Sequence, residues 1–358
     1  MIVVLTSNYN AGILQLALQM KNELKKIFGD SILFVPIQSN LSGEDIELYD
    51  RKSSLIPFAP CYKRIARRIE SYSPQLVFIC DTNLITARIA LSLKTNIPIY
   101  SIVHDITSHP TYRSAASHFI GYFKKIFSSR LLKKATKIVL LSKHSYNQFP
   151  LQHPNLAEKR VLLPLGAHVP NTESHRPPEL MIEPGFILFF GRIDKYKGLL
   201  NLLRTFEKSK DIIRNQLLIA GDGCLTSEEE AIIKRNSKSI VLLKRYISDG
   251  EMIWLYKNSS CVVLPYIESS QSGVLSIAYY FRKPVIVSDL EGLTEFLDEG
   301  KTGVVFHNAD ELVNYLIEIP LKSTQMSEYI ANYYSHNLEW ANNLKKIFMC
   351  SQEIFCDK

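Results

Sequence analysis

The sequence predicts an α/β protein with two Rossmann-like domains that face a central cleft. Short apolar runs rich in β-branched residues alternate with longer stretches of helical period, which is the pattern of parallel strands joined by crossover helices. The alternation stops in a proline-rich stretch at residues 166–185 and then starts again. Since 358 residues exceed the usual size of one domain, we interpret this stretch as a linker. Ligands of such domains bind at the carboxyl ends of the strands.

The composition narrows the class of protein and of partner. Hydrophobic residues make up 46% of the chain and charged residues 22%, which is typical of a folded protein with a large core and excludes disorder along the whole chain. The net charge of +7 favours an anionic partner such as a nucleotide, a phosphate, a nucleic acid or an acidic membrane surface. The net charge alone does not distinguish among these partners.

The cysteines and the apolar runs indicate the compartment. The six cysteines never have C-x-x-C spacing and several lie in apolar runs, so we expect buried, reduced thiols in a cytosolic protein. No run approaches the length of a membrane span, about 18 apolar residues. Residues 1–6 have the character of a first strand and not of a signal peptide. We therefore expect a cytoplasmic protein whose membrane contact, if any, is peripheral and at the inner face of the cell membrane.

The first domain is expected to cover residues 1–170. Each expected strand is a short apolar run, and each expected helix carries apolar residues at helical spacing. Strands are predicted at residues 2–6, 32–36, 76–80, 99–103, 137–141 and 161–163, and helices at 12–28, 62–72 and 84–94. Residues 119–137 add a basic stretch with aromatic residues at roughly helical spacing and no acidic residue.

The second domain is expected to cover residues 171–335, followed by a final segment at 336–358 that contains an amphipathic helix. Its strands and helices follow the same rules as those of the first domain. Strands are predicted at residues 186–190, 216–220, 240–244, 261–265, 284–288 and 303–306, and helices at 198–208, 228–238, 252–258, 274–281 and near Thr294.

The most specific chemistry follows the apolar strand at 186–190, where the chain reads GRIDKYKG over residues 191–198. Glycine permits a sharp turn, and Arg192 and Lys197 place two cations at the mouth of the cleft. A guanidinium can form paired hydrogen bonds with phosphate oxygens, and an ammonium adds a point charge. These two side chains are candidates to neutralise a diphosphate leaving group without a metal ion.

A strand followed by G-R-x-x-x-x-K-G resembles the donor-site motif of GT-B glycosyltransferases, in particular the family-4 retaining enzymes, or glycosyl transferases group 1. The resemblance implies transfer of a sugar from a nucleotide-diphosphate sugar, a UDP-sugar being favoured, to a hydroxyl of a glycan or lipid-linked glycan, with retention. It also implies that the segment 336–358 crosses back to the first domain.

Further segments lie where this family places its donor-binding residues. The turn after the strand at 216–220 reads GDG, and the segment from 241 to 266 resembles the part that holds the nucleotide base. A glycine that opens a helix offers free backbone N–H groups and a positive helix end to phosphate. The resulting donor-binding candidates are Gly221, Gly223, Tyr246, Ile247, Gln271, Ser272, Gly273 and Val274.

The sequence departs from the family in one respect. Many members carry a pair of glutamates in the segment that opens this helix. Aligning on Gly273 puts Ser270 and Ala278 at those positions, and counting from Glu268 puts Ser276 at the second one. We take Glu268 as the candidate catalytic carboxylate on the sugar side, against the alternative of a solvated loop acid. A second acidic candidate is Glu291.

The first domain is expected to supply the acceptor side. Gly12 lies between the first strand and its helix, where a small residue lets a ligand approach the helix N-terminus. His104 and Asp105 end a strand and resemble the His-Asp element of the family, so both are candidate catalytic residues; the alternative is a structural histidine. The nine histidines show no metal-ligand spacing, and we predict no metal site and no cofactor besides the donor.

The basic stretch at 119–137 suits a helix that lies against anionic lipid headgroups, and Lys63, Arg64, Arg67 and Arg68 add charge to the same domain. A merely solvated face is the alternative. No recognition motif for nucleic acid accompanies the charge. The basic domain favours a polyprenyl-diphosphate-linked acceptor, and hence surface polysaccharide biosynthesis such as that of lipopolysaccharide or capsule.

Two other functions remain open at the level of sequence. One is a non-catalytic nucleotide-sugar-binding partner subunit of a glycosyltransferase, because the glutamate pair is missing. The other is a dinucleotide-dependent oxidoreductase, which is weaker because neither glycine turn has G-x-G-x-x-G spacing. Turnover of a nucleotide sugar separates the first alternative from an enzyme, and NAD(P) binding tests the second.

Overall fold

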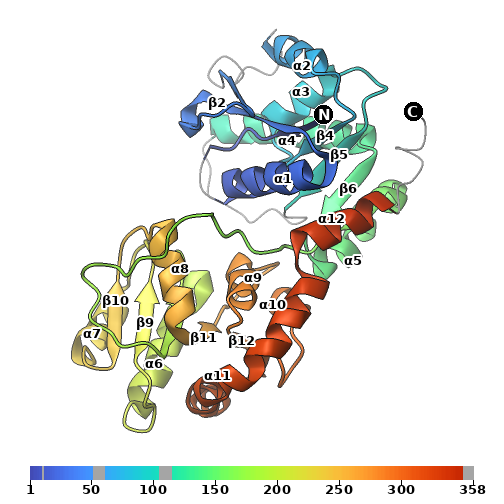
Figure 1. Ribbon diagram of the computed structural model, residues 1–358. Helices are drawn as coiled ribbons and strands as arrows, with labels where there is room; N and C mark the ends of the chain where they lie inside the picture. The colour runs from blue at the N-terminus through green and yellow to red at the C-terminus, as the bar shows by residue number, and fades with distance from the viewer. Residues whose placement is uncertain (10–11, 51–60, 105–114, 350–358) are drawn as a thin grey trace. The chain divides into compact units, whose positions relative to one another are not determined.

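The computed structural model describes residues 1–9, 12–50, 61–104 and 115–349. The chain divides into two compact units (Figure 1). Unit 1 comprises residues 1–164 and the C-terminal residues from 343 onward, and unit 2 comprises residues 165–342. Each unit contains one parallel sheet with helices, so each is a Rossmann-like domain.

The sheet of unit 1 has the strand order β3-β2-β1-β4-β5-β6-β7, and every neighbouring pair is parallel. The strands predicted from sequence are all present, with small differences at their ends. Strand β3 was not predicted, because it is short and carries polar as well as apolar residues. The strands are β1 Ile2–Leu5, β2 Ser31–Pro36, β3 Ile46–Tyr49, β4 Leu76–Ile79, β5 Ile99–Val103, β6 Lys137–Leu140 and β7 Arg160–Leu162.

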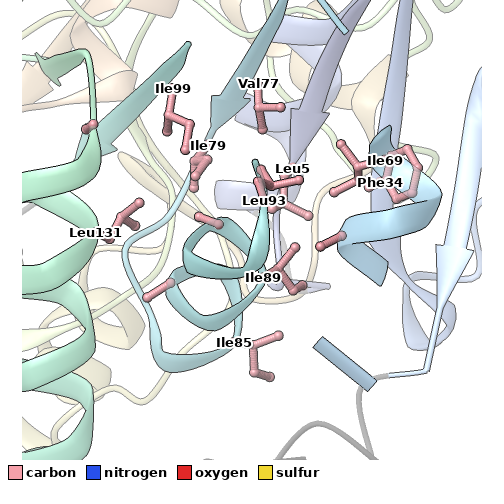
Figure 2. Close-up of a cluster of buried hydrophobic side chains, with 14 of the residues drawn as sticks. Leu5, Phe34, Ile69, Val77, Ile79, Ile85, Ile89, Leu93, Ile99 and Leu131 are labelled. Carbon is pink, nitrogen blue, oxygen red and sulfur yellow. The ribbon is translucent and has the colours of Figure 1, made fainter. Parts of the chain in front are cut away.

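The helices of unit 1 use their apolar sides to cover this sheet. Strand side chains such as Leu5, Val77 and Ile79 point toward Ile85 and Ile89 of helix α3 (Figure 2). Figure 2 also shows Ile69 of α2 and Leu131 of α4 in the same cluster. The helices are α1 Ile13–Phe28, α2 Cys61–Ser71, α3 Leu84–Ser92, α4 Ala115–Lys134 and α5 Lys143–Gln152.

The sheet of unit 2 has the order β10-β9-β8-β11-β12-β13, again with all pairs parallel. The first strand of the unit, β8, thus lies between β9 and β11. Chain connections leave β8 and β11 in opposite directions, and this makes the carboxyl ends of these two strands the switch point where ligands of such sheets bind. The strands are β8 Phe186–Phe190, β9 Leu217–Ala220, β10 Ile240–Leu243, β11 Ser259–Leu264, β12 Val285–Ser288 and β13 Gly303–Phe306.

Several helices of unit 2 begin at a side chain that accepts hydrogen bonds from the free N–H groups of the first turn. Thr226 with Glu229 and Ser248 with Glu251 form capping boxes at the starts of α7 and α8. Helix α11 contains Pro320 and was not predicted from the sequence. The helices are α6 Leu199–Ser209, α7 Ser227–Arg235, α8 Asp249–Asn258, α9 Gly273–Tyr280, α10 Glu291–Thr294, α11 Ala309–Asn337 and α12 Trp340–Met349.

Helix α12 contributes residues to both units. Within unit 2, the indole Nε1 of Trp340 donates to the Ala167 carbonyl at 2.9 Å. Within unit 1, the ring of Phe348 stacks on Tyr100 with 5.5 Å between the ring centroids. The buried aromatic contact explains why the chain from residue 343 groups with unit 1.

Two further observations concern the compartment. Cys61, Cys80 and Cys261 are buried free thiols, and Cys224 is an exposed one. Within the described ranges, no helix combines the length and the apolar character that crossing a membrane requires.

Candidate functional site

The candidate site of unit 2 lies at the switch point, where the loop after β8 meets the loop after β11. The contact between them is made by Lys197 and Tyr266. The ammonium of Lys197 donates to the phenol oxygen of Tyr266 at 3.1 Å and lies 4.9 Å from the centroid of its ring. It also donates to the Phe190 carbonyl at the end of β8, at 3.4 Å. Two residues 69 positions apart in the sequence thus form one polar cluster at the carboxyl ends of the strands.

Lys197 and Arg192 differ in solvent exposure, although the sequence predicted the same position for both. Both were expected at the mouth of a cleft, but Lys197 is only 6% exposed, whereas Arg192 is exposed. Burial lowers the pKa of Lys197. Among the described residues no carboxylate forms an ion pair with this ammonium. An unpaired buried cation is costly, so it indicates a site that takes an anion.

The glycines of this site allow backbones to approach one another. Gly198 has φ +67°, and a Cβ there would lie 1.8 Å from the Pro265 carbonyl oxygen. A Cβ on Gly221 would lie 2.0 Å from the Gly191 oxygen, and one on Gly223 would lie 2.2 Å from the Ile193 oxygen. The loops after β8 and β9 therefore run side by side, with the Ile193 N–H donating to the Asp222 carbonyl at 2.7 Å. Gly221 and Gly223 are needed for this packing, whatever they do for a ligand.

The N-terminus of α9 forms the other side of the cluster. Ser272 caps the helix by accepting from the Leu275 N–H at 3.4 Å, and its hydroxyl also hydrogen-bonds Tyr266. A Cβ on Gly273 would contact only a Leu165 side-chain carbon, at 4.0 Å, so the first turn is open. Val274 faces Gly191, whose Cβ would lie 3.8 Å from a Val274 methyl group. The structure thus brings Ser272, Gly273 and Val274 close to the loop that carries Lys197.

Gln271 contributes a further sign of a ligand. Its side-chain oxygen is buried and has no hydrogen-bond partner among the described residues. Buried polar atoms are nearly always paired, and an unpaired one in a native fold calls for an explanation such as a missing ligand or water. The neighbouring Ser269 hydroxyl donates to the Gln271 carbonyl at 3.1 Å, which fixes the loop that carries this side chain.

The residues proposed for a nucleotide base lie at the end of β10. Tyr246 is 65% exposed, and Ile247 is half-buried against the core. The adjacent Arg245 forms two hydrogen bonds with Glu251, at 2.7 and 2.9 Å, and one with Glu179 at 2.5 Å. This ion pair ties the segment to the start of α8 and holds Tyr246 in place. Arg245 was not predicted, and no sequence signal distinguishes it from a solvated arginine.

Glu251→Gln should destabilise unit 2 in a pH-dependent way. The Arg245 guanidinium lowers the pKa of Glu251 from 4.5 to about 2. A carboxylate with a lowered pKa stabilises the fold above pH 4.5, and this contribution is lost as the pH falls toward 2. We expect the variant to lose about 2 kcal/mol of unfolding free energy at neutral pH, after allowance for the partly exposed arginine.

Urea denaturation followed by tryptophan fluorescence measures this loss, because both tryptophans, Trp254 and Trp340, belong to unit 2. The gap between variant and parent should narrow as the pH drops below 4.5. Glu179→Gln removes the exposed partner of the same arginine and should cost much less. Equal losses from both variants would contradict the assignment.

The acidic candidates are less closely tied to this cluster. Glu268 and Glu291 are both exposed. The alternative positions for a second glutamate are buried: Ala278 has no exposed surface, and the Ser276 hydroxyl donates to the Leu165 carbonyl. Carboxylates at 276 or 278 would therefore point into packed structure, which gives a physical reason for the missing pair in this chain.

Unit 1 has a polar cluster at its own switch point, between β1 and β4. The buried carboxylate of Asp81 accepts from the Thr6 hydroxyl at 2.7 Å, the Ser7 N–H at 2.9 Å and the Thr86 hydroxyl at 2.7 Å. Ser7 also hydrogen-bonds Asn83, the N-cap of α3. Asp81 was not predicted as a site residue, since a single acid after a strand is common.

Of the predicted residues of unit 1, His104 contacts the residue that precedes Asp81. The half-buried His104 donates from Nε2 to the Cys80 carbonyl at 2.7 Å, next to Asp81 in sequence. Gly12 precedes α1 with φ +88°, and nothing lies within 4 Å of a Cβ built there. Asp105 lies outside the described residues. The ranges that the structure describes contain no group of three or more His, Cys, Asp or Glu side chains arranged to hold a metal ion.

Comparison with known proteins identifies the class of domain. Residues 171–335 match the family Glycosyl transferases group 1. An uncharacterized glycosyltransferase of Methanocaldococcus jannaschii, MJ1607, is 26% identical over 148 residues, which cover 41% of this chain and 38% of that protein. The chain therefore spans about two fifths of the length of this curated relative.

Solved structures match over nearly the whole chain. A glycosyltransferase from Rickettsia africae superposes with a TM-score of 0.74 at 19% identity, covering 100% of this chain and 99% of that one. HepE of Anabaena, solved in complex with UDP-glucose, gives 0.69 at 15% identity and coverages of 98% and 99%. At these identities the likeness is one of fold. Residues 171–335 therefore resemble the glycosyl transferases group 1 family, and the chain, with one Rossmann-like domain in each unit, has the GT-B fold.

Proposed function

We propose that the protein is a glycosyltransferase that moves a sugar from a nucleotide-diphosphate sugar to a hydroxyl of a glycan or lipid-linked glycan. The observation that carries this proposal is the buried ammonium of Lys197, which has no carboxylate partner within the described residues and lies at the switch point of a group 1 domain. Such a site is built to receive an anionic group.

The anionic group is the diphosphate of the donor. Lys197 supplies a fixed charge, the exposed guanidinium of Arg192 lies in the same loop, and the open first turn of α9 supplies backbone N–H groups at Gly273 and Val274. Positive groups held in place before the reaction stabilise the charge that develops on a departing diphosphate. With this charge supplied by the protein, we propose that transfer needs no bound metal ion.

The remaining donor contacts follow from the same geometry. The buried Gln271 side-chain oxygen is satisfied if a sugar hydroxyl donates to it, and the Ser272 hydroxyl lies one residue away. Tyr246 and Ile247, at the end of β10, are the proposed contacts of the base. HepE, which shares the fold, binds UDP-glucose, and this supports a UDP-hexose as the donor here.

The proposed chemistry proceeds with retention. The acceptor oxygen forms a bond to the anomeric carbon while the bond from that carbon to the diphosphate oxygen breaks. The hydroxyl proton passes to the leaving phosphate, so the reaction needs no further co-reactant. We propose that His104 and Asp105 on the unit 1 side, together with Glu268, contact the sugar and acceptor hydroxyls.

The acceptor side is proposed to meet an anionic membrane. Lys124, Lys125, Arg130 and Lys133 of α4 are exposed, as are Lys63, Arg64 and Arg67 of α2. The apolar side of α4 is already packed in the core through Phe127, Leu131 and Leu132. Membrane contact would therefore be electrostatic, without insertion of this helix into the bilayer. This supports a polyprenyl-diphosphate-linked acceptor, cytoplasmic action at the inner face, and a role in surface polysaccharide synthesis.

Arg192→Ala tests the proposal at the donor site. Removing a guanidinium that binds diphosphate should lower the affinity for the donor or kcat/KM at least about tenfold, since a hydrogen bond to a charged group contributes 1.5 to 3 kcal/mol. Isothermal titration with UDP and steady-state kinetics measure both quantities. Arg214→Ala, another exposed arginine of unit 2, is the matched control and should behave like the parent.

A second function, that of a non-catalytic nucleotide-sugar-binding subunit, is favoured by the buried Ala278 and Ser276 at the positions of the second glutamate. The two functions separate when the protein is first screened by thermal shift with uridine, guanosine and adenosine diphosphate sugars, since a bound ligand raises the melting temperature. The stabilising donor is then tested for transfer and for slow hydrolysis. Stabilisation without either reaction under any acceptor favours the binding subunit.

A further inference from the structure

We propose that Tyr266 is a positioning residue of the donor site, whose phenol group joins the Lys197 ammonium to the N-terminus of α9. This inference rests on the proposed function, because it assigns to these two groups a shared ligand, the donor diphosphate. Tyr266 was not singled out by the sequence, and its own side chain does not need to touch the substrate.

The first half of the connection is the contact with Lys197. An ammonium has three N–H donors. One is directed to the Tyr266 phenol oxygen at 3.1 Å and a second to the Phe190 carbonyl at 3.4 Å. The described residues leave the third donor to a ligand. Because the cation also lies over the ring, 4.9 Å from its centroid, Tyr266 determines both the place and the direction of this donor.

The second half is the contact with Ser272. The Ser272 hydroxyl donates to the same phenol oxygen, and burial raises the pKa of Tyr266 by more than this hydrogen bond lowers it. The Ser272 oxygen stays available as an acceptor. That oxygen accepts from the Leu275 N–H at 3.4 Å as the N-cap of α9. The phenol oxygen thus accepts from both Lys197 and Ser272, and it joins the loop cation to the N-cap of α9.

Tyr266 is itself held firmly. The side chain is 6% exposed and its ring packs against Tyr196 with 6.1 Å between centroids. Its backbone carbonyl accepts from the Ser288 hydroxyl at 2.7 Å, and the next residue, Ile267, donates its N–H to the Tyr196 carbonyl at 2.7 Å. Burial raises the pKa of Tyr266, so the phenol stays neutral. A rigid neutral bridge of this kind fixes the loop cation and the helix end in one geometry.

Tyr266→Phe removes the bridging oxygen and keeps the ring. We expect kcat/KM for the donor to fall about tenfold, the range of one hydrogen bond to a charged group. Loss of an acceptor for the ammonium also lowers the pKa of Lys197, so the alkaline decline in donor affinity should begin at lower pH than in the parent. A residue that merely supports the fold would leave this pH profile unchanged.

Tyr256→Phe is the matched control. Tyr256 is a buried tyrosine of the same unit, and its hydroxyl has no hydrogen-bond partner in the part of the chain that the structure describes. Its loss should leave kinetics and pH profile as in the parent. A double-mutant cycle of Tyr266→Phe with Ser272→Ala tests the bridge directly, because two residues that act through one connection give effects well short of additive.

The outcomes separate this proposal from the proposed function. If Lys197→Met abolishes donor binding while Tyr266→Phe matches the parent in kinetics and pH profile, the positioning role is overturned and the donor site stands. If Lys197→Met has no effect either, the donor site itself is overturned. An NMR titration of the lysine ammonium in the unliganded protein gives an independent readout: the pKa of Lys197 should be lower in Tyr266→Phe, and an unchanged pKa would contradict the bridge.

Discussion

Lys197→Met should lower donor affinity by about a hundredfold or more, because it removes a buried charge that has no carboxylate partner among the described residues and that we propose to bind the donor. Methionine fills much of the same volume without the charge, so the fold should tolerate the change and even gain stability from losing a buried cation. Titration with UDP measures the affinity, and the melting temperature without ligand checks the fold.

Lys195→Met is the control for this experiment. Lys195 lies in the same loop but is exposed, so its charge is screened by solvent and its loss should change affinity little. If both variants bind donor equally well, Lys197 has no part in the site. A variant that binds weakly but is also unfolded would be recognised by its melting curve and replaced by Lys197→Gln.

The pH dependence of binding has a defined sign. Burial lowers the pKa of Lys197 below 10.5. The cation is present below this lowered pKa and is lost as the pH rises through it, so donor affinity should decline at a lower pH than it would with an ordinary lysine. Bound diphosphate favours the charged form and shifts the decline upward. Affinity measured from neutral to alkaline pH, against Lys197→Met, isolates this contribution.

Gly198→Ala should have the largest effect on stability. The new Cβ would lie 1.8 Å from the Pro265 carbonyl oxygen, so the loops after β8 and β11 must separate. We expect the variant to lose about 4 kcal/mol of unfolding free energy, which is in the range of severe changes to a protein core. Gly300→Ala is the matched control, since Gly300 has a similar φ of +76° but nothing within 4 Å of its Cβ.

Gly300→Ala should lose only about 1 kcal/mol of unfolding free energy, which is the cost of an alanine in left-handed backbone. The difference between the two variants therefore measures the steric effect alone, and tryptophan fluorescence during urea unfolding reports it. Because Pro265 precedes Tyr266, any Gly198→Ala protein that folds should also bind donor poorly. Equal stability of the two variants would show that the loops separate at no cost.

The fold was predictable from the sequence because each half repeats one simple pattern. Runs such as Phe186–Phe190 are apolar throughout, which only a strand buried on both faces requires. The strand at Ile46–Tyr49 was missed because it is only four residues long and lies at the sheet edge, where Glu47 interrupts the apolar run and Leu48 is exposed. The long helix α11 was not predicted at all, and it contains Pro320, a residue that usually ends a helix.

The sequence predicted candidate site residues only where the residue type and its local motif indicate a function. Lys197 and Gly273 lie in motifs that resemble phosphate-binding patterns, so the sequence predicted them as donor-binding residues. Tyr266 follows an apolar strand and is indistinguishable there from a core tyrosine. Its role depends on a contact with Lys197, far away in the chain, and Asp81 depends in the same way on Thr6 and Ser7. Partners brought together by the fold leave no local pattern.

The polar side chains at the switch point of unit 1 are satisfied by hydrogen bonds, and some of those at the switch point of unit 2 are not. We expect the backbone near the two switch points to respond differently to a bound nucleotide. In unit 1 the Asp81 carboxylate is fully surrounded by donors, whereas in unit 2 Lys197 keeps a free donor and the Gln271 oxygen has no partner among the described residues. Backbone amides near Asp81 should therefore exchange with solvent deuterium at one rate whether or not nucleotide is present. Amides of the β8 and β11 loops should become slower only when it binds, which makes unit 2 the half whose fluctuations report occupancy.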